Sequence, residues 1–197
     1  MQIGVIAIQG NIREHEDAIL RALRIEKREA EVVRIKHKGI VPACDALIIP
    51  GGESTTIGLL LEREGIASEI RTAAQSGIPI MGTCAGMVLL AKNGDDQVRK
   101  TGQPLLGLMD ATVNRNAFGR QKESFEHLID FKGLDLPFNA VFIRAPCITS
   151  YGKDVEILSQ YTGRIVSARQ KNLLTLAFHP ELTKDIRIHQ YFLKMLR

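Results

Sequence analysis

A pentapeptide that places a cysteine between two glycines constrains this chain more than any other stretch. Gly82-Thr83-Cys84-Ala85-Gly86 follows the apolar run at residues 78–81 and precedes a helical pattern at residues 87–91. A strand, a tight turn and a helix in this order are typical of a nucleophile elbow, in which the turn presents a nucleophilic side chain. Glycines are needed there because the turn is strained and its backbone passes close to neighbouring strands. The N-terminus of the following helix favours the thiolate form of Cys84.

A second motif supplies the partners that a nucleophilic cysteine needs. Phe178-His179-Pro180-Glu181 ends the apolar run at residues 173–177, so a histidine and a carboxylate follow a predicted strand two residues apart. We therefore interpret Cys84, His179 and Glu181 as nucleophile, general base and the residue that orients the base. Taken singly, such a cysteine is usually a core residue and such a histidine a structural group. The two motifs together, each at a predicted strand end, favour catalysis.

Strand and helix patterns alternate in the first half of the chain, which predicts a parallel sheet covered by helices on both faces. Asn11 is expected to cap the first helix, with Glu14 completing a capping box, and Gly77 is expected to follow the end of the third. The inward face of the first helix is predicted at Ile12, His15, Ile19, Leu20 and Leu23. The predicted strands lie at residues 2–9, 31–36, 45–50 and 78–81, and further helices at residues 54–64 and 66–76.

After about residue 104 the pattern changes to short strands separated by turn residues, which favours antiparallel strands added to the parallel core. These strands are predicted at residues 110–114, 124–131, 140–144, 155–160, 164–170 and 173–178, and a last helix at residues 183–197. The sequence therefore predicts an α/β protein with a mostly parallel central sheet. Its length suits one domain, residues 1–197.

The composition argues against several classes of protein. No apolar run approaches the roughly 20 residues of a membrane span, and the N-terminus lacks the features of a signal peptide. The cysteines are odd in number and widely spaced, so we expect a reducing, cytoplasmic location, with Cys44 and Cys147 as core residues. The net charge of +4 is scattered, which argues against a nucleic-acid surface. The five histidines show no metal-ligand spacing, so no metal site is expected.

The loop after the third predicted strand, Pro50-Gly51-Gly52-Glu53-Ser54-Thr55, is a candidate ligand-binding turn. A glycine pair lets backbone N–H groups face a ligand, and Ser54 or Thr55 is expected to cap the next helix. In elbow hydrolases the oxyanion hole combines the N–H after the nucleophile with one from a neighbouring loop. Here those donors would be Ala85 and Gly52. Taken alone, the loop favours a plain left-handed turn, but the need of Cys84 for a second oxyanion donor favours the ligand-binding interpretation. The spacing excludes a Walker-type phosphate loop.

Taken in order along the chain, these motifs resemble the class I, triad-type glutamine amidotransferases. Finer motifs resemble the glutaminase subunits of pyridoxal 5′-phosphate synthases within that family, from the first strand to the last helix. GTCAG marks only the superfamily, whereas the motifs RNAFGRQ, at residues 115–121, and FIRAP, at residues 142–146, are far more specific to these subunits. The motifs of that closer match are Ile8-Gln9-Gly10, the loop at residues 50–56, Arg115-Asn116-Ala117-Phe118-Gly119-Arg120-Gln121, Val141-Phe142-Ile143-Arg144-Ala145-Pro146 and residues 178–183.

The resemblance implies a three-layer fold and a role for each motif residue. Cys84, His179 and Glu181 would form the triad, as the residues alone indicate. The implied L-glutamine site consists of Gly52, Glu53, Ser54, Arg115, Ile143 and Arg144. An arginine suits the substrate α-carboxylate because its fork can hold two oxygens. Arg120 fits a structural ion pair as well as a binding role, and Cys147 receives no chemistry.

The implied activity is hydrolysis of L-glutamine to L-glutamate and ammonia without any metal or organic cofactor. In this family the ammonia passes to a separate (β/α)8-barrel synthase subunit within a large hetero-oligomer. We therefore expect low activity in the isolated chain and activation when the barrel docks. Three alternatives remain at this level: the glutaminase of another amidotransferase, such as imidazole glycerol phosphate synthase, a cysteine peptidase, and a non-catalytic scaffold subunit.

Overall fold

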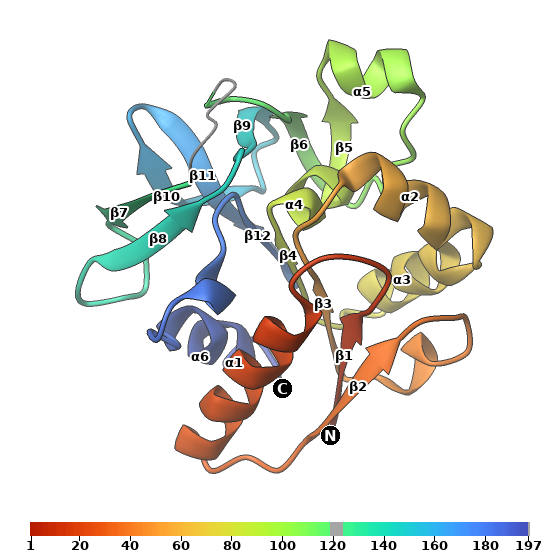
Figure 1. The fold of residues 1–197 in the computed structure, drawn as a ribbon, viewed down its shortest axis with the longest axis vertical. Helices are drawn as coiled ribbons and strands as arrows, with labels where there is room; N and C mark the ends of the chain where they lie inside the picture. The colour runs from red at the N-terminus through yellow and green to blue at the C-terminus, as the bar shows by residue number, and fades with distance from the viewer. Residues whose placement is uncertain (119–123, 197) are drawn as a thin grey trace.

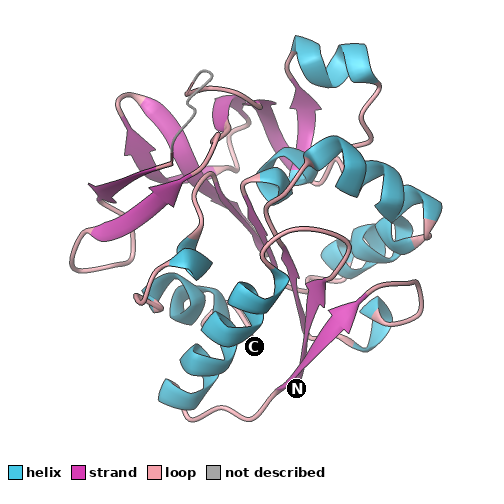
Figure 2. Cartoon of the chain, viewed as in Figure 1, coloured by secondary structure: helices cyan, strands magenta, loops and turns pink. Residues whose placement is uncertain are grey.

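The computed structural model describes residues 1–118 and 124–196. A large sheet runs through the molecule, with helices packed against both of its faces (Figures 1 and 2). Around its parallel strands, α1 (Ile12–Ile25) and α6 (Arg187–Leu193) lie on one face, and α2 (Ser54–Arg63) and α3 (Ile66–Gln75) lie on the other (Figure 1). This three-layer arrangement is the α/β fold with a mostly parallel core that the sequence predicted.

The main sheet has the strand order β2-β1-β3-β4-β12-β11-β9-β6-β5, and β10 also pairs with β11. Its first five strands are mutually parallel and β11, β9, β6 and β10 join by antiparallel pairing, while the edge strand β5 runs parallel to β6. These strands are β1 (Gln2–Ile6), β2 (Glu31–Ile35), β3 (Ala46–Ile49), β4 (Ile80–Thr83), β5 (Ala91–Gly94), β6 (Met109–Asn114), β9 (Cys147–Tyr151), β10 (Glu156–Tyr161), β11 (Arg164–Gln170) and β12 (Leu173–Leu176).

Two further strands and several short helices complete the described structure. The strands β7 (Phe125–Ile129) and β8 (Phe138–Phe142) form a separate antiparallel pair. The short helices are α4 (Ala85–Leu90), α5 (Asp96–Thr101), and the 3₁₀ turns η1 (Val41–Ala43) and η2 (Pro180–Leu182). α4 follows β4 directly, and η2 follows β12 after a three-residue connection.

The centre of the sheet is apolar because helices cover both of its faces. Every residue of β3, β4 and β12 is buried, which is the pattern of parallel strands between two helical layers. One cluster of buried apolar side chains extends from β1 to α6. None of the helices in the two described segments is long and apolar enough to cross a membrane.

One sequence-based expectation about the sheet was wrong, and the correction matters for the site. The strand at residues 173–178 was grouped with the added antiparallel strands, but β12 pairs in parallel with β4, with Leu176 beside Thr83. The carboxyl ends of the two strands therefore lie at the same edge of the sheet. Residues that follow these ends, Cys84 and His179, are brought together by this pairing.

Other differences are local. β1 ends at Ile6 rather than at residue 9, and α6 begins at Arg187 rather than at residue 183. The sequence did not predict β5, α5 or β9. Leu20, expected on the inward face of α1, is 44% exposed. Gly77 does follow α3 with a positive φ of 86°, as predicted for a residue just past a helix end.

Candidate active site

Cys84 lies at the apex of the turn between β4 and α4, with φ 48° and ψ −102°. A residue other than glycine rarely adopts this backbone conformation, so the turn is strained at Cys84. The flanking glycines permit close backbone contact. A Cβ on Gly86 would lie 2.4 Å from Ile49 O, and one on Gly82 would lie 2.7 Å from the backbone of Gly86. The predicted strand–turn–helix geometry and the close backbone contacts at its glycines are both confirmed.

His179 and Glu181 form a buried pair beside the elbow. His179 Nδ1 lies 2.7 Å from Glu181 Oε1, and both residues are only 4% exposed. The backbone of His179 is fixed by its N–H, which donates to Val141 O at 2.8 Å. Gly51 locates the ring relative to the cysteine: a Cβ on Gly51 would lie 2.5 Å from His179 Cε1 and 3.3 Å from Cys84 Cβ. The three predicted triad side chains therefore occupy adjacent positions.

The surroundings of the pair favour its charged form. Burial alone would lower the pKa of His179, but hydrogen bonds with Cys84 and Glu181 and their negative charges raise it to about 10. Burial would raise the pKa of Glu181, but the electrostatic attraction of the His15 side chain, together with hydrogen bonds from His179 and Asn11, lowers that pKa to about 2. Near pH 7 the carboxylate is ionised and the imidazole is protonated. A protonated imidazole beside Cys84 Sγ is a suitable partner for a thiolate.

Asn11 occupies the N-cap position of α1 without capping the helix. Its side chain makes no hydrogen bond to the helix N–H groups, so the predicted capping box with Glu14 was wrong. Asn11 Nδ2 instead donates to Glu181 Oε1 at 3.1 Å. A residue expected to start a helix is thus a second donor to the carboxylate that orients His179.

A small pocket opens beside Cys84. Its volume of about 80 Å³ is well below the roughly 300–1,000 Å³ of sites for drug-sized ligands, so it suits a small substrate. Every residue predicted for the glutamine site or the oxyanion hole lines it: Gly52, Glu53, Ser54, Ala85, Arg115, Ile143 and Arg144. Val88, Asn116 and Pro146 also line the pocket and were not predicted. Each is a near neighbour in sequence of a predicted residue, which is the signal that would have found them.

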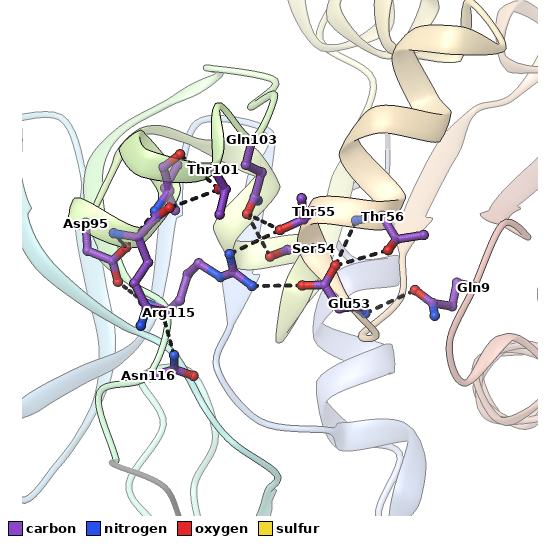
Figure 3. A network of polar contacts seen from close by, with 12 residues as sticks. Gln9, Glu53, Ser54, Thr55, Thr56, Asp95, Thr101, Gln103, Arg115 and Asn116 are labelled. Carbon is purple, nitrogen blue, oxygen red and sulfur yellow. Dashed lines mark hydrogen bonds and ion pairs between the residues drawn. The ribbon is translucent and has the colours of Figure 1, made fainter.

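One wall of this pocket is a polar network, shown in Figure 3. Arg115 reaches from the end of β6 to the start of α2, where its Nη2 lies 2.8 Å from Glu53 Oε1 and its Nη1 donates to Thr55 Oγ1 at 3.1 Å. The backbone N–H of Arg115 donates to Asp95 Oδ2 at 2.8 Å. Gln103 Oε1 accepts hydrogen bonds from the hydroxyls of Ser54 and Thr55. The network fixes Arg115 from both ends.

Glu53, rather than Ser54 or Thr55, caps α2. Its Oε2 accepts a hydrogen bond from the backbone N–H of Thr56 at 2.8 Å. Burial would raise the pKa of Glu53, but the N–H groups of Thr56 and Thr55, and the charge of Arg115, lower it below its usual value. The N–H of Glu53 donates to Gln9 Oε1 at 3.1 Å, which ties this loop to the one after β1. The pocket therefore has a fixed negative charge at one wall.

The opposite wall is the segment after β8. Cys84 Sγ lies 3.8 Å from the carbonyl oxygen of Ile143. Arg144 is exposed, has a positive φ of 45°, and forms no ion pair within the described part of the chain. Arg144 thus brings to the pocket lining a positive charge that has no ion-pair partner among residues 1–118 and 124–196.

The remaining predicted residues fall outside the site. Burial raises the pKa of Cys44 to about 11 and also raises that of Cys147, so both thiols stay protonated in the core. Arg120, together with Gly119 and Gln121 of its motif, lies outside the described residues. Within residues 1–118 and 124–196, no cluster of three or more His, Cys, Asp or Glu side chains could hold a metal ion.

Comparison with known proteins adds independent information. A protein from Methanosarcina mazei named pyridoxal 5′-phosphate synthase subunit PdxT is 64% identical over 193 residues, which cover 98% of this chain and 97% of that protein. A protein of the same name from Archaeoglobus fulgidus is 55% identical over 195 residues, covering 99% and 98%.

Solved structures agree with these relatives. A crystal structure of a glutamine amidotransferase, 44% identical in sequence, superposes with a TM-score of 0.87 over 98% of both chains. A chain of the PurLQS structure from Thermotoga maritima, only 20% identical, has a TM-score of 0.64 and shows the shared fold alone. Residues 5–197 match the SNO glutamine amidotransferase family. From a strained cysteine turn, a buried histidine–glutamate pair and these matches, we conclude that the chain belongs to the SNO glutamine amidotransferase family.

Proposed function

We propose that this chain hydrolyses L-glutamine to L-glutamate and ammonia through Cys84, His179 and Glu181. The observation that carries the proposal is the parallel pairing of β12 with β4, which sets the 2.7 Å His179–Glu181 pair beside the strained cysteine turn. Nucleophile, base and orienting carboxylate in this order are the groups that acyl transfer requires.

In the proposed reaction, the Cys84 thiolate attacks the side-chain carbonyl carbon of glutamine. The N–H groups of Ala85 and Gly52 stabilise the resulting oxyanion; that of Ala85 is a free donor because it begins α4. His179 gives its proton to the departing nitrogen, the C–N bond breaks, and ammonia leaves a γ-glutamyl thioester. His179 then takes a proton from water, which attacks the thioester and releases glutamate and the thiolate.

The charges around the pocket suit an α-amino acid. The carboxylate of Glu53, held by Thr56 and Arg115, is placed to receive the substrate α-ammonium group. Arg144 is assigned to the substrate α-carboxylate, because it has no ion pair among the described residues whereas Arg115 is already bonded to Glu53 and Thr55. Arg115 then contributes its positive charge and keeps Glu53 in position.

The names of the relatives support the choice of partner. Both proteins described above are called subunits of pyridoxal 5′-phosphate synthase. We therefore assign this chain the task of supplying ammonia to a separate synthase subunit, a (β/α)8 barrel, within a hetero-oligomer. The proposed location is the cytoplasm, and residues 1–197 are assigned to one domain. The continuous core from β1 to α6 supports a single domain.

The test is glutamate production from L-glutamine by the purified chain, alone and with the barrel synthase subunit. We expect glutamate in the mixture, no glutamate from the Cys84→Ala variant, and a higher kcat when the barrel is present. Absence of glutamate in both arms would contradict the glutaminase assignment. An equal kcat with and without the barrel would contradict activation by docking, and would favour the glutaminase of another amidotransferase.

A further inference from the structure

A second layer of buried polar side chains lies behind the triad, on the inner face of α1. His15 is fully buried there. Its Nε2 lies 3.1 Å from Thr83 Oγ1 and 3.3 Å from Glu181 Oε2. Helix α1, the end of β4 and the turn η2 therefore meet at one imidazole ring.

Packing alone does not account for a histidine at this position. Burying an imidazole costs free energy unless its nitrogens are paired, whereas a leucine would fill an inward helix position without that cost. A second fully buried histidine, His189 of α6, provides a comparison. Its ring centroid is 5.8 Å from that of His15, but neither of its nitrogens has a hydrogen-bond partner among the described residues. Of these two rings, His15 is the one that contacts the triad.

The protonation state of His15 follows from its surroundings. Burial lowers its pKa, an effect that outweighs the opposing attraction of Glu181, so the ring is neutral near pH 7 and carries one N–H. If that proton were on Nδ1, the lone pair of Nε2 would face an ionised carboxylate 3.3 Å away. The proton therefore belongs on Nε2, between Thr83 Oγ1 and Glu181 Oε2.

The two oxygens of Glu181 are held unequally. Oε1 accepts from His179 Nδ1 at 2.7 Å and from Asn11 Nδ2 at 3.1 Å. Oε2 is buried and accepts no well-aligned hydrogen bond from the residues described; its polar contact is His15 Nε2, at 3.3 Å. Without the His15 N–H this oxygen would be bare, and a buried carboxylate with one bare oxygen gains by rotating toward another donor. Such a rotation would take Oε1 away from His179.

We propose that His15 is a positioning residue for the triad. Its Nε2–H stabilises Oε2, so that Oε1 stays aimed at His179 Nδ1, and it links the carboxylate to Thr83, the residue before the nucleophile. His15 does not line the substrate pocket, so it acts on kcat through Glu181 and has no direct contact with glutamine. The inference rests on the proposed glutaminase function.

The test compares glutaminase kinetics of His15→Leu, His15→Gln and His189→Leu in the complex with the barrel synthase subunit. Leucine removes the N–H, and we expect kcat to fall roughly tenfold with KM unchanged, the scale of one hydrogen bond to a charged group. Glutamine returns an N–H near the position of Nε2, and we expect it to restore most of kcat. His189→Leu, an equally buried change that touches no triad residue, should leave kcat at the wild-type value.

A double-mutant cycle identifies the route of the effect. If His15 acts through Glu181, His15→Leu should lower kcat no further in a Glu181→Gln background. If His15→Leu does not fold, His15→Asn replaces it, because its amide is too short to reach the position of Nε2. The positioning role would be overturned if His15→Leu, or His15→Asn in its place, kept the wild-type kcat. It would also be overturned if His15→Gln and His189→Leu lowered kcat as much as that variant does. If the wild type itself showed no glutaminase activity, the proposed glutaminase function would be overturned instead.

Discussion

The two sides of the pocket are built in different ways. On the reaction side, the side chains of His179 and Glu181 are 5% and 0% exposed and bonded to each other. On the recognition side, the side chains of Arg115 and Glu53 are 18% and 42% exposed and form an ion pair of similar length, 2.8 Å. Burial makes the first pair electrostatically strong and costly to disturb, whereas water screens the second.

In the proposed reaction, this difference gives separate tasks to the two sides. Groups in a sealed environment shift their pKa values strongly and act on the reacting atoms, so changes there are expected to alter kcat. Groups that remain partly solvated hold the substrate in both its ground and transition states, so changes there are expected to alter KM.

The largest effect is expected from Cys84→Ala, which removes the nucleophile and should abolish glutamine hydrolysis while the fold and partner binding are retained. Substitution of Cys44 or Cys147 by alanine should affect stability alone, because both are buried away from the pocket. A glutamine-analogue electrophile followed by peptide mapping checks the assignment. Labelling at Cys44 or Cys147 with Cys84 unmodified would refute it.

The next effect separates the base from its orienting carboxylate. His179→Asn removes proton transfer in both steps, and we expect kcat to fall roughly 10⁴-fold or more. Glu181→Gln keeps the imidazole and one oxygen acceptor, so we expect its fall in kcat to be about 10–100-fold smaller than that of His179→Asn. Steady-state kinetics in the presence of the barrel subunit measure both variants. Near-parental kcat in either variant would remove that residue from the triad.

The sequence predicted the local parts of this site and missed the non-local ones. The elbow, the His179–Glu181 pair and the glycine loop are contiguous motifs, so spacing alone located them. The partners of Asn11 and β12 are set by contacts between segments far apart in the chain: Asn11 is 170 residues from Glu181, and β12 pairs with β4. Local sequence patterns predicted Asn11 as a helix cap and β12 as an antiparallel strand. In the structure, tertiary contacts give Asn11 a different hydrogen-bond partner and pair β12 in parallel with β4.

Burial on the reaction side also predicts how stability depends on pH. The pKa of Glu181 falls from an ordinary 4.5 to about 2 in the folded state, a difference worth about 3 kcal/mol. Because the folded pKa is depressed, this stabilisation is present above pH 4.5 and is lost as the pH falls toward 2. Urea unfolding at stepwise lower pH should therefore show a steeper loss for wild type than for Glu181→Gln.

The recognition side supplies the control for that titration. Glu53 is partly exposed, so Glu53→Gln should change the acid dependence of the unfolding free energy much less than Glu181→Gln does. Parallel acid profiles for wild type and Glu181→Gln would mean that Glu181 is not held as a buried, ionised group. Such a result would remove the contrast between the two sides.

The smallest effect is expected at Arg144. This residue is exposed, lines the pocket and has no ion pair within the described residues, so its substitution should leave the fold and the triad unchanged. Arg144→Met is expected to raise KM for glutamine roughly tenfold, on the scale of one hydrogen-bonded charge pair, with kcat nearly unchanged. Arg144→Lys should keep the charge but lose the two-oxygen fork, and should give an intermediate KM. A fall in kcat with constant KM would show that this wall, despite its exposure, contributes to the transition state, and the division between the two sides would then be wrong.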